Sequence, residues 1–143
     1  MLPLLLTLWF VPTQPLVDGA HLRYVARREG IPEDLFQSVA WVESQNALRV
    51  GAAHACRSRP QWRYCAWGRF QLKLVTADRY CGLRFENLRR YGSNVDCAAV
   101  VLRALYDETG SWYLAVLHYY NPSEGRDAQA YANAVCTAAG VAP

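Results

Sequence analysis

From about residue 18 onward, apolar residues recur at the three- and four-residue spacing of amphipathic helices, interrupted by Gly and Pro. This periodicity predicts a mainly α fold, because hardly any segment alternates as a strand does. A loop or small hairpin is expected over about 46–64, and a small β element near 62–72. We expect a first helix over about Gly19–Arg28, ended by Gly30, and a second one that has Pro32 in its first turn and ends near Ser44. A short helix is expected from its cap Thr76 to Tyr80, and a long helix from its cap Asn94 to Thr109. The last two helices are expected from the cap Ser111 to Tyr120 and over about Asp127–Ala139.

The chain is long enough for one domain with a real core: it has 143 residues, of which 52% are hydrophobic. Such a composition excludes intrinsic disorder, which requires few apolar residues and a high net charge. The net charge of +3 is small for a nucleic-acid-binding domain, so we expect no nucleic-acid partner. We expect a single compact domain that is monomeric.

The N-terminus begins with an apolar run of about ten residues within 1–12, which is too short to span a bilayer. It is typical of a signal peptide, with cleavage expected between Thr13 and Ala20. We therefore assign residues 1–20 to a signal peptide or apolar N-terminal segment and 21–143 to the domain, and expect export to the periplasm, the cell envelope or the medium. The alternative is an N-terminal segment that stays buried or touches a membrane.

Five cysteines lie in the chain without Cys-x-x-Cys pairs or a His pair at zinc-finger spacing. We therefore expect no metal and no cofactor. In an exported protein the cysteines predict disulfides, and short loops favour Cys56–Cys65 and Cys81–Cys97, with Cys136 left over. The alternative is five buried, reduced thiols.

Glu43 is the candidate catalytic acid. It follows Ala40 by three residues and Phe36 by seven, so it shares a helix face with apolar side chains. A carboxyl group in such surroundings is costly to ionise, and its pKa rises toward the range that a general acid needs near neutral pH. The alternative is an exposed Glu in the last turn of a helix.

Aromatic residues make up 13% of the chain, and Trp and Tyr suit the apolar faces and hydroxyl rims of sugar rings. Trp62, Tyr64 and Trp67 cluster in the loop after Glu43, where core packing is less expected. We expect Trp112 and at least half of the other aromatic residues to fill the core.

Four motifs, in order, resemble the soluble lytic transglycosylase domain, a lysozyme-like family that cleaves bacterial peptidoglycan. The resemblance covers about Ile31 to Val135. The motifs are the Glu-Ser pair in Trp41-Val42-Glu43-Ser44, a Gly-Leu-Met-Gln type loop at Gly68-Arg69-Phe70-Gln71, an Ala-Tyr-Asn-Ala-Gly type segment at Tyr119-Tyr120-Asn121 through Gly125, and Tyr131 in the last helix. Asn94-Val95-Asp96-Cys97 is similar to the start of the family's long helix. Each motif alone is weak, but their order and spacing together are fairly specific.

The resemblance implies a lysozyme-like fold and a role for each motif. Glu43 would be the single catalytic acid/base and Ser44 would hydrogen-bond near it. Gln71 and Asn121 would bind the N-acetyl and hydroxyl groups of the sugar, and Tyr120 and Tyr131 would line the cleft. Arg69 and Phe70 replace the usual Leu and Met, which is expected to alter one cleft wall, with Phe70 against the substrate.

The implied reaction cleaves the β-1,4 bond between N-acetylmuramic acid and N-acetylglucosamine and leaves a 1,6-anhydro-muramyl end. Glu43 would protonate the leaving oxygen and then deprotonate the muramyl 6-hydroxyl, so no second acid is required. A hydrolase of the same fold, such as a goose-type lysozyme or endolysin, needs a second carboxylate, for which Asp127 and Glu124 are candidates. A non-catalytic glycan-binding envelope protein is the third alternative. Expected partners are peptidoglycan strands and, by association, a secretion, pilus or conjugation machine.

Overall fold

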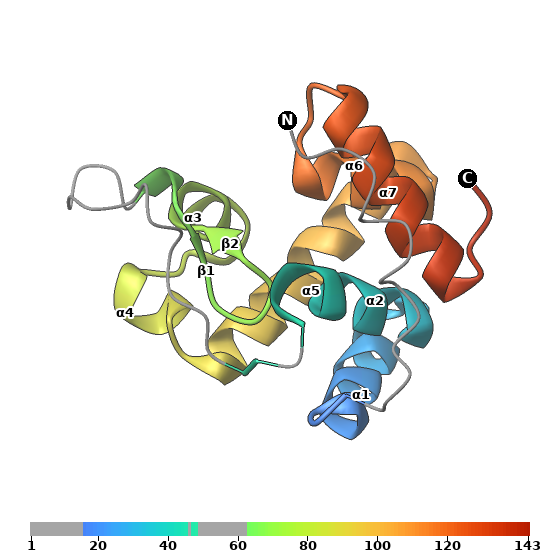
Figure 1. Ribbon diagram of the computed structural model, residues 1–143. Helices are drawn as coiled ribbons and strands as arrows, with labels where there is room; N and C mark the ends of the chain where they lie inside the picture. Colours follow the sequence, from blue (N-terminus) through green and yellow to red (C-terminus); the bar gives the residue numbers. More distant parts are fainter. Residues whose placement is uncertain (1–15, 46, 49–62) are drawn as a thin grey trace.

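Helices dominate the computed structural model, which describes residues 16–45, 47–48 and 63–143 (Figure 1). The elements are α1 (Gly19–Glu29), α2 (Glu33–Ser44), β1 (Ala66–Trp67), β2 (Leu72–Lys73), α3 (Leu74–Cys81), α4 (Phe85–Leu88), α5 (Tyr91–Thr109), α6 (Trp112–Tyr120) and α7 (Arg126–Ala139). The predicted class is confirmed: this is a mainly helical single domain with a small antiparallel hairpin.

The long helix α5 occupies the centre of the fold because its buried residues recur around much of its circumference. Val95, Ala98, Val101 and Leu102 are all essentially inaccessible to solvent. The helix packs against α1, α3, α4 and α6. In Figure 1 it runs between the hairpin with α3 and α4 on one side and α1, α2, α6 and α7 on the other. Side chains from both sides therefore meet over α5.

Most helix ends lie where the sequence predicts them. Gly30, Gly110 and Gly140 follow α1, α5 and α7 in the left-handed conformation, which lets them close a helix without steric cost. Ser111 caps α6 by accepting a hydrogen bond from the backbone N–H of Leu114. These signals are confirmed because they act within a few residues of the helix end.

Two predicted caps are wrong. Thr76 lies inside α3, which begins two residues earlier at Leu74. Asn94 lies inside the first turn of α5 and is fully buried. Its amide nitrogen donates to the carbonyl oxygens of Trp67 (2.9 Å) and Leu88 (3.1 Å), and its amide oxygen accepts from the N–H of Phe70 (2.9 Å). Three tertiary hydrogen bonds thus replace the expected local cap. The short helix α4 was not predicted.

The hairpin pairs Ala66 with Lys73 and Trp67 with Leu72. Its turn begins at Gly68, whose φ is +78°. A Cβ atom at this position would lie 2.4 Å from the amide nitrogen of Asn94, so a side chain would displace the buried asparagine. Gly68 therefore allows the turn to lie directly on α5.

The disulfide Cys81–Cys97 is present and joins the end of α3 to α5, as predicted. Cys136, the predicted leftover, is a buried free thiol whose pKa burial raises to about 11. Cys56 lies outside the described residues, so the pairing Cys56–Cys65 stays a prediction.

The described fold begins at Leu16, which is buried in the core, and α1 starts at Gly19. The folded domain therefore starts before residue 21, the expected boundary. Residues 1–15, most of the expected signal segment, lie outside the described part of the chain. Within the described ranges, no helix has the length and apolar character needed to cross a membrane.

Candidate active site

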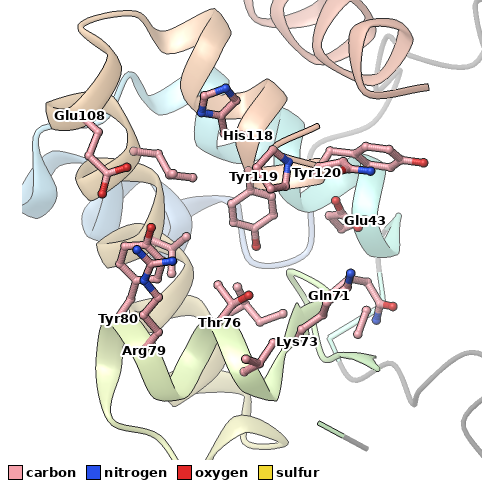
Figure 2. A pocket seen from close by; sticks show the side chains of 17 residues that line it. Glu43, Gln71, Lys73, Thr76, Arg79, Tyr80, Glu108, His118, Tyr119 and Tyr120 are labelled. Carbon is pink, nitrogen blue, oxygen red and sulfur yellow. The ribbon is translucent and has the colours of Figure 1, made fainter. Parts of the chain in front are cut away.

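A cavity of about 630 Å³ lies between the hairpin and α3 on one side and α2, α5 and α6 on the other (Figure 2). Its wall includes Glu43 from α2, Gln71 from the hairpin turn, and Tyr119 and Tyr120 from α6, followed by Asn121. The cavity thus brings together residues from the first three sequence motifs. At one end of the view in Figure 2 lie Glu43 and Gln71, and at the other lie Arg79, Tyr80 and Glu108.

Glu43 lies in the last turn of α2 as a half-buried residue and lines the cavity wall. The hydroxyl of Tyr131 donates a hydrogen bond of 2.6 Å to its Oε1. Burial raises the pKa of Glu43 from 4.5 to about 7, and the bond from Tyr131 opposes this rise only in part. The upward direction agrees with the sequence prediction, and it places the titration of Glu43 near neutral pH.

Three tyrosines surround this carboxyl group. Tyr131 is buried and its ring stacks on that of Tyr120, with centroids 4.7 Å apart. The hydroxyl of Tyr119 donates to the carbonyl oxygen of Phe70 at 2.7 Å. Burial raises the pKa of both Tyr119 and Tyr131 well above the ordinary value, so both hydroxyls remain donors. Tyr120 is 45% exposed and lines the cavity, which leaves its ring free to contact a ligand.

Gln71 and Asn121 each use one atom of the side-chain amide group in a local hydrogen bond and leave the other atom without a partner among the described residues. The amide nitrogen of Gln71 donates to the carbonyl oxygen of Gly68 at 3.0 Å, while its amide oxygen has no partner among the described residues. The amide oxygen of Asn121 accepts from the N–H of Ser123 at 2.9 Å, which leaves its amide nitrogen without a partner there. The two side chains therefore offer one acceptor and one donor to the cavity.

Phe70 and Ser44 do not line the cavity, contrary to the expectation that they bind substrate. Phe70 is fully buried and stacks on Phe36 at 4.5 Å, so it belongs to the core. The hydroxyl of Ser44 lies 2.6 Å from the carbonyl oxygen of Arg69 and 3.0 Å from that of Ala40. The expected altered cleft wall is also wrong for Arg69, which is fully buried.

The aromatic residues expected in the loop after Glu43 contribute less to the cavity wall than expected. Trp62 lies outside the described residues, and Tyr64 and Trp67 do not line the cavity. Trp67 instead packs edge-on against Phe85, with centroids 4.9 Å apart. Trp112 stacks on Tyr106 at 4.1 Å against the core, as expected.

The two acids proposed as rivals of Glu43 lie elsewhere. Glu124 is paired with His118, with Oε1 and Nε2 2.6 Å apart, and Asp127 lies in the first turn of α7; neither lines the cavity. Glu108 is a second acid on the cavity wall, and it was not predicted as a site residue from the sequence. It follows Leu105 by three residues and Val101 by seven, and both of these also line the cavity. Residues at these spacings share a helix face, so this spacing was the available signal.

Two basic residues that were not predicted as site residues also lie on the cavity wall. Lys73 and Arg79 line the cavity from the hairpin and α3, and neither has a carboxylate partner in the described part of the chain. Within the same ranges, no group of three or more His, Cys, Asp or Glu side chains is arranged to hold a metal ion.

No protein-family model matches the chain, and no curated protein is significantly similar to it. The functional assignment therefore depends on the residues of the cavity and on the motif resemblance.

Proposed function

We propose that this protein is a peptidoglycan lytic transglycosylase with Glu43 as its single acid/base. The observation that carries the proposal is the position of the Glu43 carboxyl group. It lies on the wall of a cavity, receives a hydrogen bond from Tyr131, and has a pKa raised by burial to about 7. A carboxyl group in this state can donate a proton near neutral pH and take one back afterwards.

In the proposed reaction, Glu43 protonates the glycosidic oxygen as the bond to the muramyl C1 breaks. The substrate's N-acetyl group stabilises the oxocarbenium-like centre. The carboxylate of Glu43 then removes the proton of the muramyl 6-hydroxyl, whose oxygen bonds to C1 and closes the 1,6-anhydro ring. The proton lost in the first step is thereby regained, and no water is consumed.

The rest of the cavity suits a glycan. The exposed ring of Tyr120 offers an aromatic face for the apolar side of a sugar. Gln71 and Asn121 offer an amide oxygen and an amide nitrogen that can pair with an N-acetyl group or hydroxyls. Together they provide the few placed polar groups and the apolar surface typical of a ligand site.

The position of Glu108 favours the transglycosylase over a hydrolase. A hydrolase needs two carboxyl groups about one scissile bond. Glu108 lies toward the opposite end of the cavity from Glu43 in Figure 2. The route that needs one carboxyl group therefore fits the cavity better.

The disulfide Cys81–Cys97 supports the proposal that the protein is exported, since disulfides persist in oxidising compartments. Peptidoglycan lies in such a compartment. We propose the periplasm or cell envelope as the site of action.

Digestion of purified sacculi, followed by mass spectrometry of the released muropeptides, tests the function. We expect products with 1,6-anhydro ends, each one water lighter than a hydrolytic product. Glu43→Gln should abolish their release, while Glu108→Gln, the matched control on the same wall, should retain it. Hydrolytic ends that disappear in Glu108→Gln would establish a hydrolase instead. Binding to sacculi without any product would establish a non-catalytic glycan-binding protein.

A further inference from the structure

The side chain of Arg69 is fully buried, does not line the cavity, and forms a bidentate ion pair with Asp18. Its Nε lies 3.0 Å from Oδ2 of Asp18 and its Nη2 lies 2.9 Å from Oδ1. The hydroxyl of Tyr91 donates to the same Oδ2 at 2.8 Å. The guanidinium group is therefore fixed on one edge by Asp18, the residue that precedes α1, and Asp18 is itself held by the first residue of α5.

The other edge of the guanidinium faces the end of α2. Its Nη1 lies 2.9 Å from the hydroxyl oxygen of Ser44 and is hydrogen-bonded to the carbonyl oxygen of Gln45. The carbonyl oxygens of Ala40 and Ala47 lie within 3.4 Å of the same nitrogen. The last carbonyl groups of a helix have no partner within the helix, and α2 has no basic residue in its last turn. Arg69 therefore supplies from a distant segment the donor that the end of α2 lacks.

A further hydrogen bond joins Ser44 at the end of α2 to the main chain of Arg69. The hydroxyl of Ser44 lies 2.6 Å from the carbonyl oxygen of Arg69, so the Ser44 side chain contacts both the guanidinium group and the main chain of Arg69. Glu43 immediately precedes Ser44, and Gln71 follows Arg69 by two residues. Both line the cavity.

We propose that Arg69 is a positioning residue that fixes the last turn of α2, and with it the carboxyl group of Glu43, relative to the turn that carries Gln71. This inference rests on the proposed function, in which Glu43 is the acid/base. A buried ion pair by itself contributes little to stability, because desolvation of both charges offsets their attraction. The pair is better explained by the geometry it imposes: displacement of a catalytic group by about 1 Å can cost on the order of a hundredfold in rate.

The effect of Arg69 on Glu43 acts through the main chain. The raised pKa of Glu43 comes from burial, and Tyr131 lowers it in part. Other titratable or charged groups facing the carboxyl group or its cavity are Tyr80, Tyr119, Tyr120, His118, Lys73, Arg79 and Glu108. If the last turn of α2 loosens, the carboxyl group gains water. Its pKa then falls toward 4.5, because burial is the larger of the two causes.

The test uses the full chain with two variants. The double variant Asp18→Asn/Arg69→Met removes the ion pair without leaving a buried charge alone, and Asn still accepts from Tyr91. Arg69→Lys keeps the charge but cannot span both Asp18 and the end of α2. The matched control is Arg103→Met/Asp107→Asn on α5. It removes an exposed ion pair of 2.9 Å and the contact of Arg103 with the carbonyl oxygen of Gly30, outside the cavity lining.

We measure the carboxyl titration of Glu43 by NMR, the turnover of sacculi and the melting temperature. For the double variant and Arg69→Lys we expect folded protein, a Glu43 pKa that is lower than in the wild type and shifted toward 4.5, and turnover reduced about ten- to a hundredfold. The control should match the wild type. An unchanged Glu43 titration and unchanged turnover in either variant would overturn the inference. Loss of folding in both would do so too, since the pair would then be needed for the fold itself.

The NMR titration separates this inference from the proposed function. If the wild type releases no anhydro products, the proposed function fails, yet the titration of Glu43 in the Arg69 variants still reports its positioning.

Discussion

The hydroxyl of Tyr131 in α7 lies 2.6 Å from the carboxylate oxygen Oε1 of Glu43 in α2, across a sequence separation of 88 residues. The hydroxyl donates, so it favours the charged carboxylate, whereas burial favours the neutral acid. Burial has the larger effect, and the pKa of Glu43 settles at about 7. Burial and this hydrogen bond together therefore set the pH at which the candidate catalytic group changes its protonation state.

Tyr131→Phe removes the hydrogen bond but keeps the aromatic ring. Because this bond lowers the pKa of Glu43, we expect that pKa to rise above about 7 in the variant. The alkaline limb of the pH–rate profile, where the acid loses its proton, should move to higher pH. Rate measurements across the neutral range check this.

The matched control is Tyr113→Phe, whose hydroxyl donates to Asn133 at 3.0 Å at an exposed position of the same α6–α7 pair. It should leave the limb in place. A limb that moves to lower pH in Tyr131→Phe contradicts the assigned role of the hydrogen bond.

Glu43→Gln should stabilise the protein at high pH. The folded-state pKa of about 7 lies above the ordinary value of 4.5, so folded Glu43 binds its proton more tightly than the unfolded chain does. The resulting stability is fully present below 4.5 and is lost as pH rises through about 7. Above that range the buried charge costs at most about 3 kcal/mol.

Chemical denaturation at about pH 5 and about pH 8 measures this difference. We expect Glu43→Gln to be on the order of 1–3 kcal/mol more stable relative to wild type at the higher pH than at the lower one. The matched control is Glu108→Gln, which makes the same exchange at another acid of the cavity wall. Equal relative stability of Glu43→Gln at both pH values would contradict the raised pKa.

Gln71→Ala and Asn121→Ala should weaken glycan cleavage while the fold stays intact. Each removes an amide group that has hydrogen-bonding capacity to spare on the cavity wall. A hydrogen bond to a ligand in such a site is worth about 1–3 kcal/mol, so kcat/KM should fall roughly 5- to 150-fold. Wild-type kinetics with an unchanged melting curve would remove these residues from the binding site.

If the N-terminal segment is cleaved on export, cleavage should occur before Leu16. Leu16 is buried, and Asp18 forms the buried ion pair with Arg69. Removal of Asp18 would leave the guanidinium unpaired, which is costly in a buried site. The intact mass of secreted protein identifies the N-terminus; a start at residue 17 or later would contradict this prediction.

Local signals explain which parts of the fold could be predicted. A glycine after an amphipathic stretch ends a helix through its own backbone, and the ends at Gly30, Gly110 and Gly140 follow from that property alone. Glu43 was also predictable, because helical spacing places it on an apolar face and burial raises its pKa.

The hairpin turn could not be predicted in the same way. Which of Arg69, Phe70 and Gln71 faces the cavity depends on backbone angles at Gly68 (φ +78°) and Gln71 (φ +47°). Those angles are held by Asn94, a residue of α5 whose apparent local role was to cap a helix. The positions of Phe70 in the core and Arg69 in an ion pair therefore depend on contacts between distant segments.

The docking of α7 onto α2 has a consequence for when the protein becomes active. The partner of Glu43 comes from the last described helix, so a chain emerging residue by residue has no complete site until α7 has been made and has packed. Contacts between residues so far apart form late in folding, after local helices. Under the proposed function, the protein could not cut the cell wall while it is unfolded, and it would become active only once α7 has packed against α2.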